Sequence, residues 1–322
     1  MHTLPLADQA AEALHKLALD EDAKRMFCHD PWFRPFTQRV ARRYVAGQTI
    51  GEAMQRARAI AARGHAVSLE YMGESVRDAA RANAETEVFL ALIATLDNEH
   101  RAASISFDLS HIGLLVSPEL GYRNLCRIAG AAGESGREVM ISAEGSDRAD
   151  LIHAAYVRVH EEAGLHHVGI TLQARLRRSD ADLQRLMAYP GKIRLVKGAF
   201  LEPAELALAR GSTELRAAFL DFARKLLLSG HPCSVATHDR SIQGELADLI
   251  VKQELPHDRC EFESLIGLGT EQIDDLQRKG FRTREYAGFG EETFLYVLNR
   301  IAEEPSRLYQ ALIDLSADTA PA

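Results

Sequence analysis

Residues 193–200 read IRLVKGAF, an apolar run of strand length that contains two cations, Arg194 and Lys197, and breaks at Gly198. Charged side chains are rare inside strands, because burying an unpaired ammonium or guanidinium group is costly. The two cations therefore predict a partner of opposite charge. An anionic ligand is the simplest partner, and a salt bridge to a carboxylate on a neighbouring strand is the alternative.

This run is the fifth of eight similar runs along the chain. Each is short, mostly apolar or β-branched, and followed by a polar or glycine-bearing loop and then by a helical pattern. The predicted strands are 66–71, 104–109, 138–143, 167–172, 193–197, 232–236, 260–265 and 281–286, and the predicted helices are 76–100, 118–133, 148–164, 180–189, 213–230, 241–255, 270–280 and 291–304. This alternation predicts a parallel sheet, and eight repeats predict closure into an α/β barrel of the TIM, or (β/α)8, type. An open, doubly wound sheet is the alternative, although no GxGxxG follows the first strand.

The predicted barrel occupies residues 65–306. Residues 1–64 lie outside the alternation and are predicted to form an N-terminal helical arm, with apolar residues at helical spacing over 4–19 and 36–63. Residues 307–322 are predicted to be a short C-terminal helix followed by a disordered tail, ADTAPA.

The composition is that of an ordinary soluble enzyme, since 46% of the 322 residues are hydrophobic, 26% are charged, and the net charge is −8. The negative charge and the scattered basic residues argue against nucleic-acid binding. Four cysteines without a CxxC spacing predict neither a zinc site nor a disulfide framework, which favours the reducing cytoplasm. The first ten residues do not resemble a signal peptide, and no apolar run approaches the roughly 20 residues of a membrane span.

Polar residues gather where the predicted strands end. In a (β/α)8 barrel the carboxyl ends of the strands form the mouth where chemistry occurs, so polar residues there favour a functional role. In chain order they are Glu70, Glu74, Asp108, Ser110, His111, Ser142, Glu144, Asp147, Gln173, Arg175, Arg194, Lys197, Thr237, His238, Asp239, Glu261, Glu263, Arg284 and Tyr286. No HxH or HExxH spacing among them predicts a metal site.

The last predicted barrel helix carries a second group of polar residues. Tyr296, Asn299, Arg300 and Glu303 are spaced at i, i+3, i+4 and i+7, so they share one helix face. A helix that follows the final strand can turn such a face toward the barrel mouth. An ion pair between Arg300 and Glu303 on a solvated surface is the alternative.

The strand ends, in this order, resemble those of the proline dehydrogenase family of flavoenzymes over nearly all of residues 65–306. The matching motifs are LEYMGE (69–74), LSHIG (109–113), LQARLRRSDADL (172–183), IRLVKGAFLEP (193–203), ATHD (236–239), EFESLIG (261–267) and YAGFGEETFLYVLNRIAEEP (286–305). The family fold is a distorted (β/α)8 barrel that binds FAD. Its reaction is hydride transfer from the carbon beside a secondary amine to the flavin, which gives an imine.

The resemblance implies one set of residues for the flavin and another for the substrate. The flavin positions are Gln173, Arg194, Lys197, Gly198, Ala199, Thr237 and His238, and the matched substrate positions are Leu265, Tyr286, Tyr296, Arg300 and Glu303. Arginine and lysine offer charge to a phosphate or a reduced flavin, and a Thr-His pair offers donors to a pyrophosphate. The flavin would then be the anionic partner of the two strand cations.

Several substrate positions depart from the family pattern. Asp108 stands where the family has a lysine, Ser142 where it has an aspartate, and Asn299 where it has the first of two arginines that grip the substrate carboxylate. Phe200 replaces an aromatic hydroxyl, and Gly288 replaces a proline. The changes at positions 108 and 299 weaken the attraction for a carboxylate, and the loss of the aspartate at position 142 offsets only part of this. The expected substrate is therefore proline or a related cyclic or secondary amine or imino acid, with free L-proline bound weakly.

Three other interpretations stay open. Arg175 or Arg284 could compensate for the missing cations in a standard proline dehydrogenase, the chain could be a catalytically degenerate flavin-binding protein, or the carboxylates could serve a metal-dependent barrel enzyme without flavin. The family reaction passes electrons to a quinone or another acceptor. The resemblance thus implies a cytoplasmic protein with at most peripheral contact to the inner face of a membrane.

Overall fold

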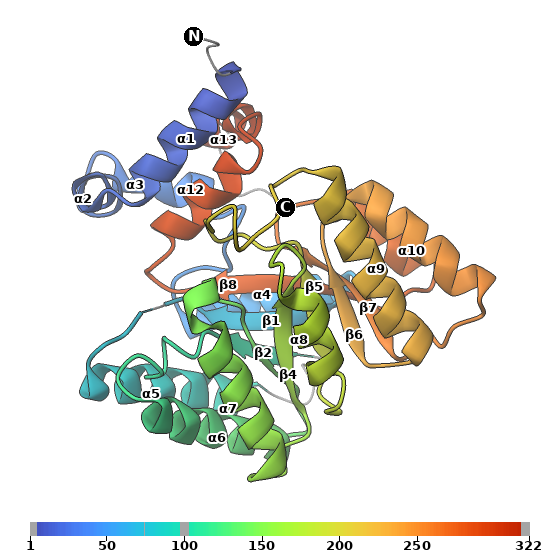
Figure 1. Ribbon diagram of the computed structural model, residues 1–322. Helices are drawn as coiled ribbons and strands as arrows, with labels where there is room; N and C mark the ends of the chain where they lie inside the picture. The colour runs from blue at the N-terminus through green and yellow to red at the C-terminus, as the bar shows by residue number, and fades with distance from the viewer. Residues whose placement is uncertain (1–4, 74, 97–102, 317–322) are drawn as a thin grey trace. The chain divides into compact units, whose positions relative to one another are not determined.

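Eight parallel strands form a closed barrel in the computed structural model, which describes residues 5–73, 75–96 and 103–316 (Figure 1). The strands follow one another around the barrel in chain order, so each pairs with its sequence neighbours. They are β1 (Ala66–Tyr71), β2 (Ser104–Phe107), β3 (Val139–Ile141), β4 (Val168–Gln173), β5 (Ile193–Val196), β6 (Cys233–Ala236), β7 (Cys260–Leu265) and β8 (Thr283–Phe289). The predicted TIM-type barrel is confirmed, and the open sheet is excluded.

A helix follows each strand of the barrel. These helices are α5 (Ala79–Thr95), α6 (Pro118–Glu134), α7 (Ala149–Glu161), α8 (Ser179–Leu186), α9 (Thr213–Ser229), α10 (Arg240–Lys252), α11 (Thr270–Arg278) and α12 (Phe294–Ala302). Several start at side-chain caps, as where Ser117 accepts a hydrogen bond from the Leu120 N–H and begins α6. The predicted helix over 76–100 begins later, at Ala79, and its last four residues lie outside the described residues.

The described chain packs as two compact units. One contains Met1–Arg56 and Ala287–Ala322, and the other contains Ala57–Tyr286. The first includes α1 (Leu6–Ala18), α2 (Glu21–His29), α3 (Arg34–Ala41), α12 and α13 (Arg307–Ser316), and α4 (Ile50–Ala62) crosses between the two. These units do not follow the predicted boundaries at 64/65 and 306/307. The predicted tail and the first four residues lie outside the described residues.

The single helix predicted over 36–63 is instead two helices with a turn between them. Gly47 adopts a left-handed conformation with φ of 107°, which residues with a side chain rarely adopt. Glu52 then accepts the N–H groups of Gln48 and Thr49 at 2.7 and 3.0 Å, which caps the start of α4. The periodic apolar pattern continues through this turn, so periodicity alone did not reveal it.

Side chains alternate between the barrel interior and the surrounding helices. Phe107 points outward, because its ring lies 5.2 Å from that of Phe89 on α5 and both are fully buried. Its neighbour Ser106 points inward, where its hydroxyl accepts a hydrogen bond from Arg194 on β5. The outer layer is thus an apolar core between strands and helices, whereas polar side chains fill the barrel interior.

Candidate active site

Arg194 lies inside the barrel and is almost fully hydrogen bonded. It is 5% exposed, and its Nε donates to Glu263 Oε2 on β7 at 3.0 Å. Its other two nitrogens donate to Ser106 on β2 at 2.9 Å and to Ser68 on β1 at 2.8 Å. Glu263 also accepts a hydrogen bond from the Ser234 hydroxyl at 2.6 Å. The guanidinium is therefore held across the barrel by neighbours from three strands, and a serine on a fourth strand holds its carboxylate partner.

Lys197 also has a carboxylate partner. Its ammonium lies 2.7 Å from Asp239 Oδ2, and both side chains are about one-third exposed. Asp239 caps α10 by accepting the N–H groups of Ser241 and Ile242. Burial raises the pKa of Asp239, but hydrogen bonds from Lys197 and the two N–H groups outweigh it, so the pKa lies below its usual value.

Both strand cations have an anionic partner within the protein, so a ligand is not needed to balance their charge. Glu263 and Asp239 supply the charges, as in the alternative of an internal salt bridge, but Glu263 lies two strands away on β7 and Asp239 lies just after β6. Sequence analysis placed both carboxylates at strand ends but could not pair them with the cations. The serines around Arg194 were missed, although Ser68 stands two residues before Glu70 on β1, a spacing that puts both side chains on one face of the strand.

Arg284 and Glu261 were expected at the mouth, but they lie at the opposite end of the barrel. Each is the second residue of its strand, since β7 begins at Cys260 and β8 begins at Thr283 and continues to Phe289. Arg284 Nε donates to Glu261 Oε1 at 2.8 Å, and Lys192 approaches the same oxygen at 3.0 Å. Burial raises the pKa of Glu261, but Arg284 and Lys192 outweigh it and hold the pKa well below its usual range. Arg284 is thus committed to a structural network.

Among the predicted flavin residues, Gln173 and Gly198 are in close contact. Gln173 ends β4 and is 5% exposed, and its Nε2 donates to the Glu144 carbonyl at 2.8 Å. Gly198 has φ of 110°, and a Cβ at this position would lie 3.0 Å from Gln173 Oε1. The glycine is therefore required both by its backbone conformation and by the side chain beside it. Ala199, the next residue, is exposed.

Thr237 and His238 follow β6 directly. Thr237 is 8% exposed, and its hydroxyl accepts a hydrogen bond from the Asp239 N–H at 3.2 Å. His238 is half-buried, and its Cβ lies 3.5 Å from where a side chain on Gly269 would begin. Together with Lys197, these residues lie at the carboxyl ends of the neighbouring strands β5 and β6.

Ser142 and Glu70 form a second polar contact in the barrel. The Ser142 hydroxyl donates to Glu70 Oε2 at 2.8 Å and lies 3.2 Å from Ser106 Oγ. Glu70 is 6% exposed on β1. A carboxylate is therefore present beside position 142 although that position itself is a serine. Asp108, one residue beyond β2, is half-buried.

Tyr286 and Leu265 are register partners on β8 and β7, and both are half-buried. The Arg194 guanidinium carbon lies 5.7 Å from the centre of the Tyr286 ring, within the range of a cation–π interaction. The second unit thus brings together Tyr286, Arg194 and the Ser106–Ser142–Glu70 chain of hydrogen bonds.

His111, another strand-end residue, has a structural role. It is 2% exposed, its Nε2 lies 3.3 Å from Glu85, and its ring packs against Tyr71 and Phe89. The hydrogen bond with His111 is the main reason that the pKa of Glu85 is lowered to about 2.

The first unit carries the other predicted substrate residues on and beside α12. Arg300 Nη2 lies 2.8 Å from Glu303 Oε1, and Arg307 approaches the same carboxylate at 3.6 Å. The Arg300 guanidinium lies 5.3 Å from the centre of the Tyr296 ring. Asn299 Oδ1 lies 3.0 Å from His15 Nδ1 on α1, a partner that no sequence spacing indicates. The Arg300–Glu303 ion pair is present as the local alternative predicted.

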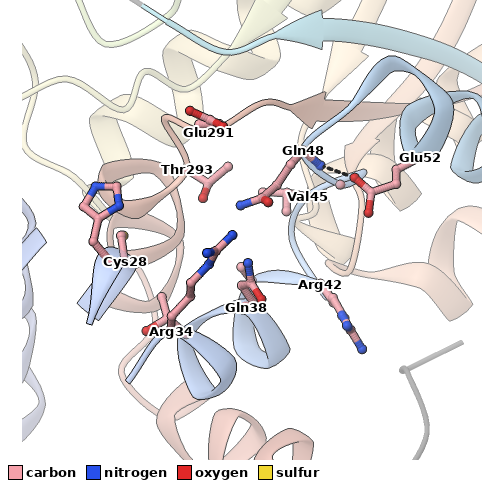
Figure 2. A pocket seen from close by; sticks show the side chains of 13 residues that line it. Cys28, Arg34, Gln38, Arg42, Val45, Gln48, Glu52, Glu291 and Thr293 are labelled. Carbon is pink, nitrogen blue, oxygen red and sulfur yellow. Dashed lines mark hydrogen bonds between the residues drawn. The ribbon is translucent and has the colours of Figure 1, made fainter. Parts of the chain in front are cut away.

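A cavity of about 360 Å³ lies within the first unit (Figure 2). Arg34 points into it between Gln38, Gln48 and Thr293. None of the predicted site residues lines it. The cavity is therefore distinct from the residues that the sequence singled out.

Neither a metal site nor a membrane-spanning helix is found among the described residues. Within them, no group of three or more histidine, cysteine, aspartate or glutamate side chains is arranged to hold a metal ion. None of the helices among them has both the length and the apolar character to cross a bilayer.

Comparisons with known proteins agree on one family. The family model described as proline dehydrogenase matches residues 53–307. Proline dehydrogenase 1 of Bacillus subtilis is 30% identical over 271 residues, which cover 84% of this chain and 88% of that protein. The proline dehydrogenase of Deinococcus radiodurans is 30% identical over 269 residues, covering 83% and 86%.

A solved structure shows the same fold. It is proline utilization A (PutA) from Bdellovibrio bacteriovorus inactivated by N-propargylglycine, with a TM-score of 0.79 at 16% identity. The match covers 97% of this chain but 38% of the PutA chain, so this chain spans little more than a third of that protein. With the family model matching the barrel and relatives matching over most of their length, the chain belongs to the proline dehydrogenase family.

Proposed function

We propose that this protein is an FAD-dependent oxidoreductase that converts proline to a cyclic imine. The family match over residues 53–307 is the observation that carries the proposal. Proline dehydrogenases are flavoenzymes, and a bound flavin would accept the hydride from the carbon beside the ring nitrogen. FAD is the form that we assign, because Lys197, Thr237 and His238 offer a cation and donors suited to a diphosphate.

The second unit has features that fit a flavin. Gln173 Oε1 is buried and accepts no hydrogen bond from any residue that the structure describes. A buried amide oxygen without a donor is unfavourable, and the N–H of an isoalloxazine ring is a donor of the required kind. Gly198 leaves space beside this oxygen that any larger residue would fill. The residues present therefore fit the cofactor that the family implies.

Arg194 is proposed to act on the flavin from a fixed position. Its hydrogen bonds to Glu263, Ser106 and Ser68 orient the guanidinium before any ligand binds. A preoriented cation favours negative charge as it develops, without the cost of reorganising the site. The Glu263 carboxylate balances this cation and reduces the net charge that it presents.

Arg300 is proposed to bind the substrate carboxylate. It is the one matched cation of the family's arginine pair, and in the described structure it is held by Glu303 at 2.8 Å. Its Nε is buried and has no hydrogen-bond partner among the described residues, so the guanidinium keeps donor capacity. Tyr296 supplies an aromatic face for the same cation.

A visible spectrum of the purified protein tests the proposal. We expect a flavin band that bleaches when L-proline is added without oxygen, and FAD as the nucleotide released on denaturation. A protein that neither contains flavin nor takes up added FAD contradicts the proposal. A flavin band that no amine bleaches would instead support the catalytically degenerate flavin-binding protein.

The substrate range is a second question, because Asn299 and Asp108 replace two cations of the family pattern. We propose that carboxylate recognition rests on Arg300 alone, so that L-proline is preferred over an analogue without a carboxylate charge by about 10- to 100-fold at most. Comparison of L-proline with L-proline methyl ester tests this. A larger preference for the free acid contradicts it and supports a standard proline dehydrogenase.

The electrons are proposed to pass to a quinone or another acceptor. We place the protein in the cytoplasm, with at most peripheral contact to the inner face of a membrane. Turnover with a water-soluble quinone, compared with turnover under oxygen alone, identifies the class of acceptor.

A further inference from the structure

The segment after β5, residues 198–208, is tied to the end of β4 by main-chain bonds. The Leu208 N–H donates to the Arg175 carbonyl at 2.8 Å, and the Arg177 N–H donates to the Leu206 carbonyl at 2.9 Å. Leu176 and Ala207 form an antiparallel bridge between these contacts. The segment therefore returns to pair with the residues that directly follow Gln173.

The Arg175 side chain joins both ends of this segment. Its Nη1 donates to the Phe200 carbonyl at 2.5 Å, while its Nη2 and Nε donate to the Leu208 carbonyl at 3.1 and 3.3 Å. The planar guanidinium presents these donors in a fixed fork, so it binds two carbonyls eight residues apart at once.

The hydrogen bonds of the Arg175 side chain go to uncharged acceptors, the carbonyls of Phe200 and Leu208. It is 5% exposed, and no carboxylate among the described residues forms an ion pair with it. Burial, and next the charge of Arg210, lowers its pKa from the usual value. Hydrogen bonds from three nitrogens to carbonyls stabilise the buried cation. This use leaves it unsuited to the role of a substitute substrate cation that the sequence left open.

The Arg175 stem also packs against the candidate flavin residues. A Cβ on Gly198 would lie 2.7 Å from both Cγ and Cδ of Arg175, and 3.0 Å from Gln173 Oε1. Arg175 thus touches Gly198 and stands two residues from Gln173. Any shift of its stem changes the space in which those two residues lie.

We propose that Arg175 is a positioning residue that clamps residues 198–208 onto the end of β4 and thereby holds Gly198 and Gln173 in place for the cofactor. The proposal rests on the proposed function, because it assumes that these two residues receive a flavin. A lysine has a single charged nitrogen and cannot reproduce the fork, whereas a methionine keeps the stem without any donor.

The test compares Arg175→Met and Arg175→Lys with a matched control, Arg177→Met. Arg177 is exposed and makes one side-chain contact, to the Ala204 carbonyl at 3.4 Å. Two quantities are measured for each full-length variant: amide hydrogen exchange by mass spectrometry, and the dissociation constant of added FAD by flavin fluorescence. Hydrogen exchange can be measured without bound cofactor, and it reports directly on how tightly residues 198–208 are held.

For Arg175→Met we expect faster exchange over residues 198–208 with unchanged exchange over α10, and FAD binding weakened about tenfold, the factor for one lost charged hydrogen bond. Arg175→Lys should fall between wild type and Arg175→Met, and Arg177→Met should match wild type. If Arg175→Met does not fold, the same comparison with Arg175→Lys decides the matter.

Failure of the proposed function and failure of the positioning role give different results. Wild-type protein that does not bind FAD contradicts the proposed function, whatever the exchange data show. Wild-type protein that binds FAD, with equal exchange and affinity in the Arg175 and Arg177 variants, overturns the positioning role alone. Faster exchange over the whole chain in Arg175→Met would also overturn it, since that result indicates general destabilisation.

Discussion

The barrel interior and the α12 helix both carry arginine–glutamate pairs, but the two pairs differ in how they are held. Arg194 and Glu263 have side-chain exposures of 6% and 3%, and serines from three strands complete their hydrogen bonds. Arg300 and Glu303 have exposures of 12% and 26% and lie one helical turn apart. A buried pair with partners on several strands is fixed by the fold, whereas a local pair near solvent can exchange partners.

This difference separates the two halves of the chemistry. Arg194, which is proposed to act on the cofactor, is part of the barrel core, so removing its partner should damage the fold. Arg300, which is proposed to bind the substrate, is held by local contacts, so changing it should alter kinetics while the fold persists.

The largest effect is expected for Glu263→Gln. This change leaves the Arg194 cation buried without a carboxylate, which typically lowers the free energy of unfolding by about 3–5 kcal/mol. The matched change on α12, Glu303→Gln, should lower it by less than about 1 kcal/mol, as for other partly exposed pairs. Urea unfolding followed by circular dichroism measures both. Similar losses from the two variants would refute the distinction between the two pairs.

A kinetic effect without a stability effect is expected for Arg300→Met. Loss of a charged hydrogen bond to the substrate carboxylate should lower kcat/KM for L-proline by about 10- to 100-fold. The reaction of L-proline methyl ester should change much less, because it lacks the carboxylate charge. Steady-state assays with both substrates check this, and an equal loss for both would show that Arg300 does not bind the carboxylate.

A smaller gain is expected when the family cations are restored together as Asp108→Lys and Asn299→Arg. The added positive charge should lower KM for L-proline by about tenfold, the value of one charged contact. His15→Ala serves as the control, since it removes the present partner of Asn299 without adding charge. A wild-type enzyme that already has a low KM for L-proline, unimproved by the double substitution, would contradict the electrostatic argument.

The smallest effect concerns Glu85, whose pKa is lowered to about 2 chiefly by its hydrogen bond with His111. A lowered carboxyl pKa stabilises the folded state above the unfolded-state value of about 4.3, and this contribution is lost as the pH falls toward 2. Glu85→Gln should therefore be less stable than wild type at pH 7, by about 1 kcal/mol, the usual net contribution of one hydrogen bond. Thermal unfolding from neutral to acid pH should show the two proteins converging, and a constant difference would exclude this linkage.

The fold could be predicted because each strand has a compact apolar signal. Strands β1 and β7 have the predicted bounds, Ala66–Tyr71 and Cys260–Leu265. Strand β8 was placed two residues too early at its start, and its end was missed because Gly288 falls within it. Glycine usually marks the end of a strand, and here hydrogen bonding continues through it.

The candidate site could be predicted only in part, because pairing depends on distance in space. The sequence indicated that Arg194 needs an anion but not that Glu263, 69 residues away, provides it. It placed Arg175 at the mouth but not its bonds to the carbonyls of Phe200 and Leu208. Asn299 and His15 meet across 284 residues, and no local pattern encodes such a contact.

The serines around Arg194 have a consequence for how this chain can change over generations. Ser68, Ser106 and Ser234 are fully buried, and each donates to or accepts from the Arg194–Glu263 pair. A larger residue at any of them would meet the fixed Arg194 guanidinium or the Glu263 carboxylate bonded to it, so single substitutions should be eliminated and viable changes should occur as linked sets. Asn299 on α12 is half-buried and lies outside this network, so substitutions there face no such restriction. Related proteins should therefore acquire new substrates through single substitutions near Asn299, while the residues of the barrel interior stay unchanged together.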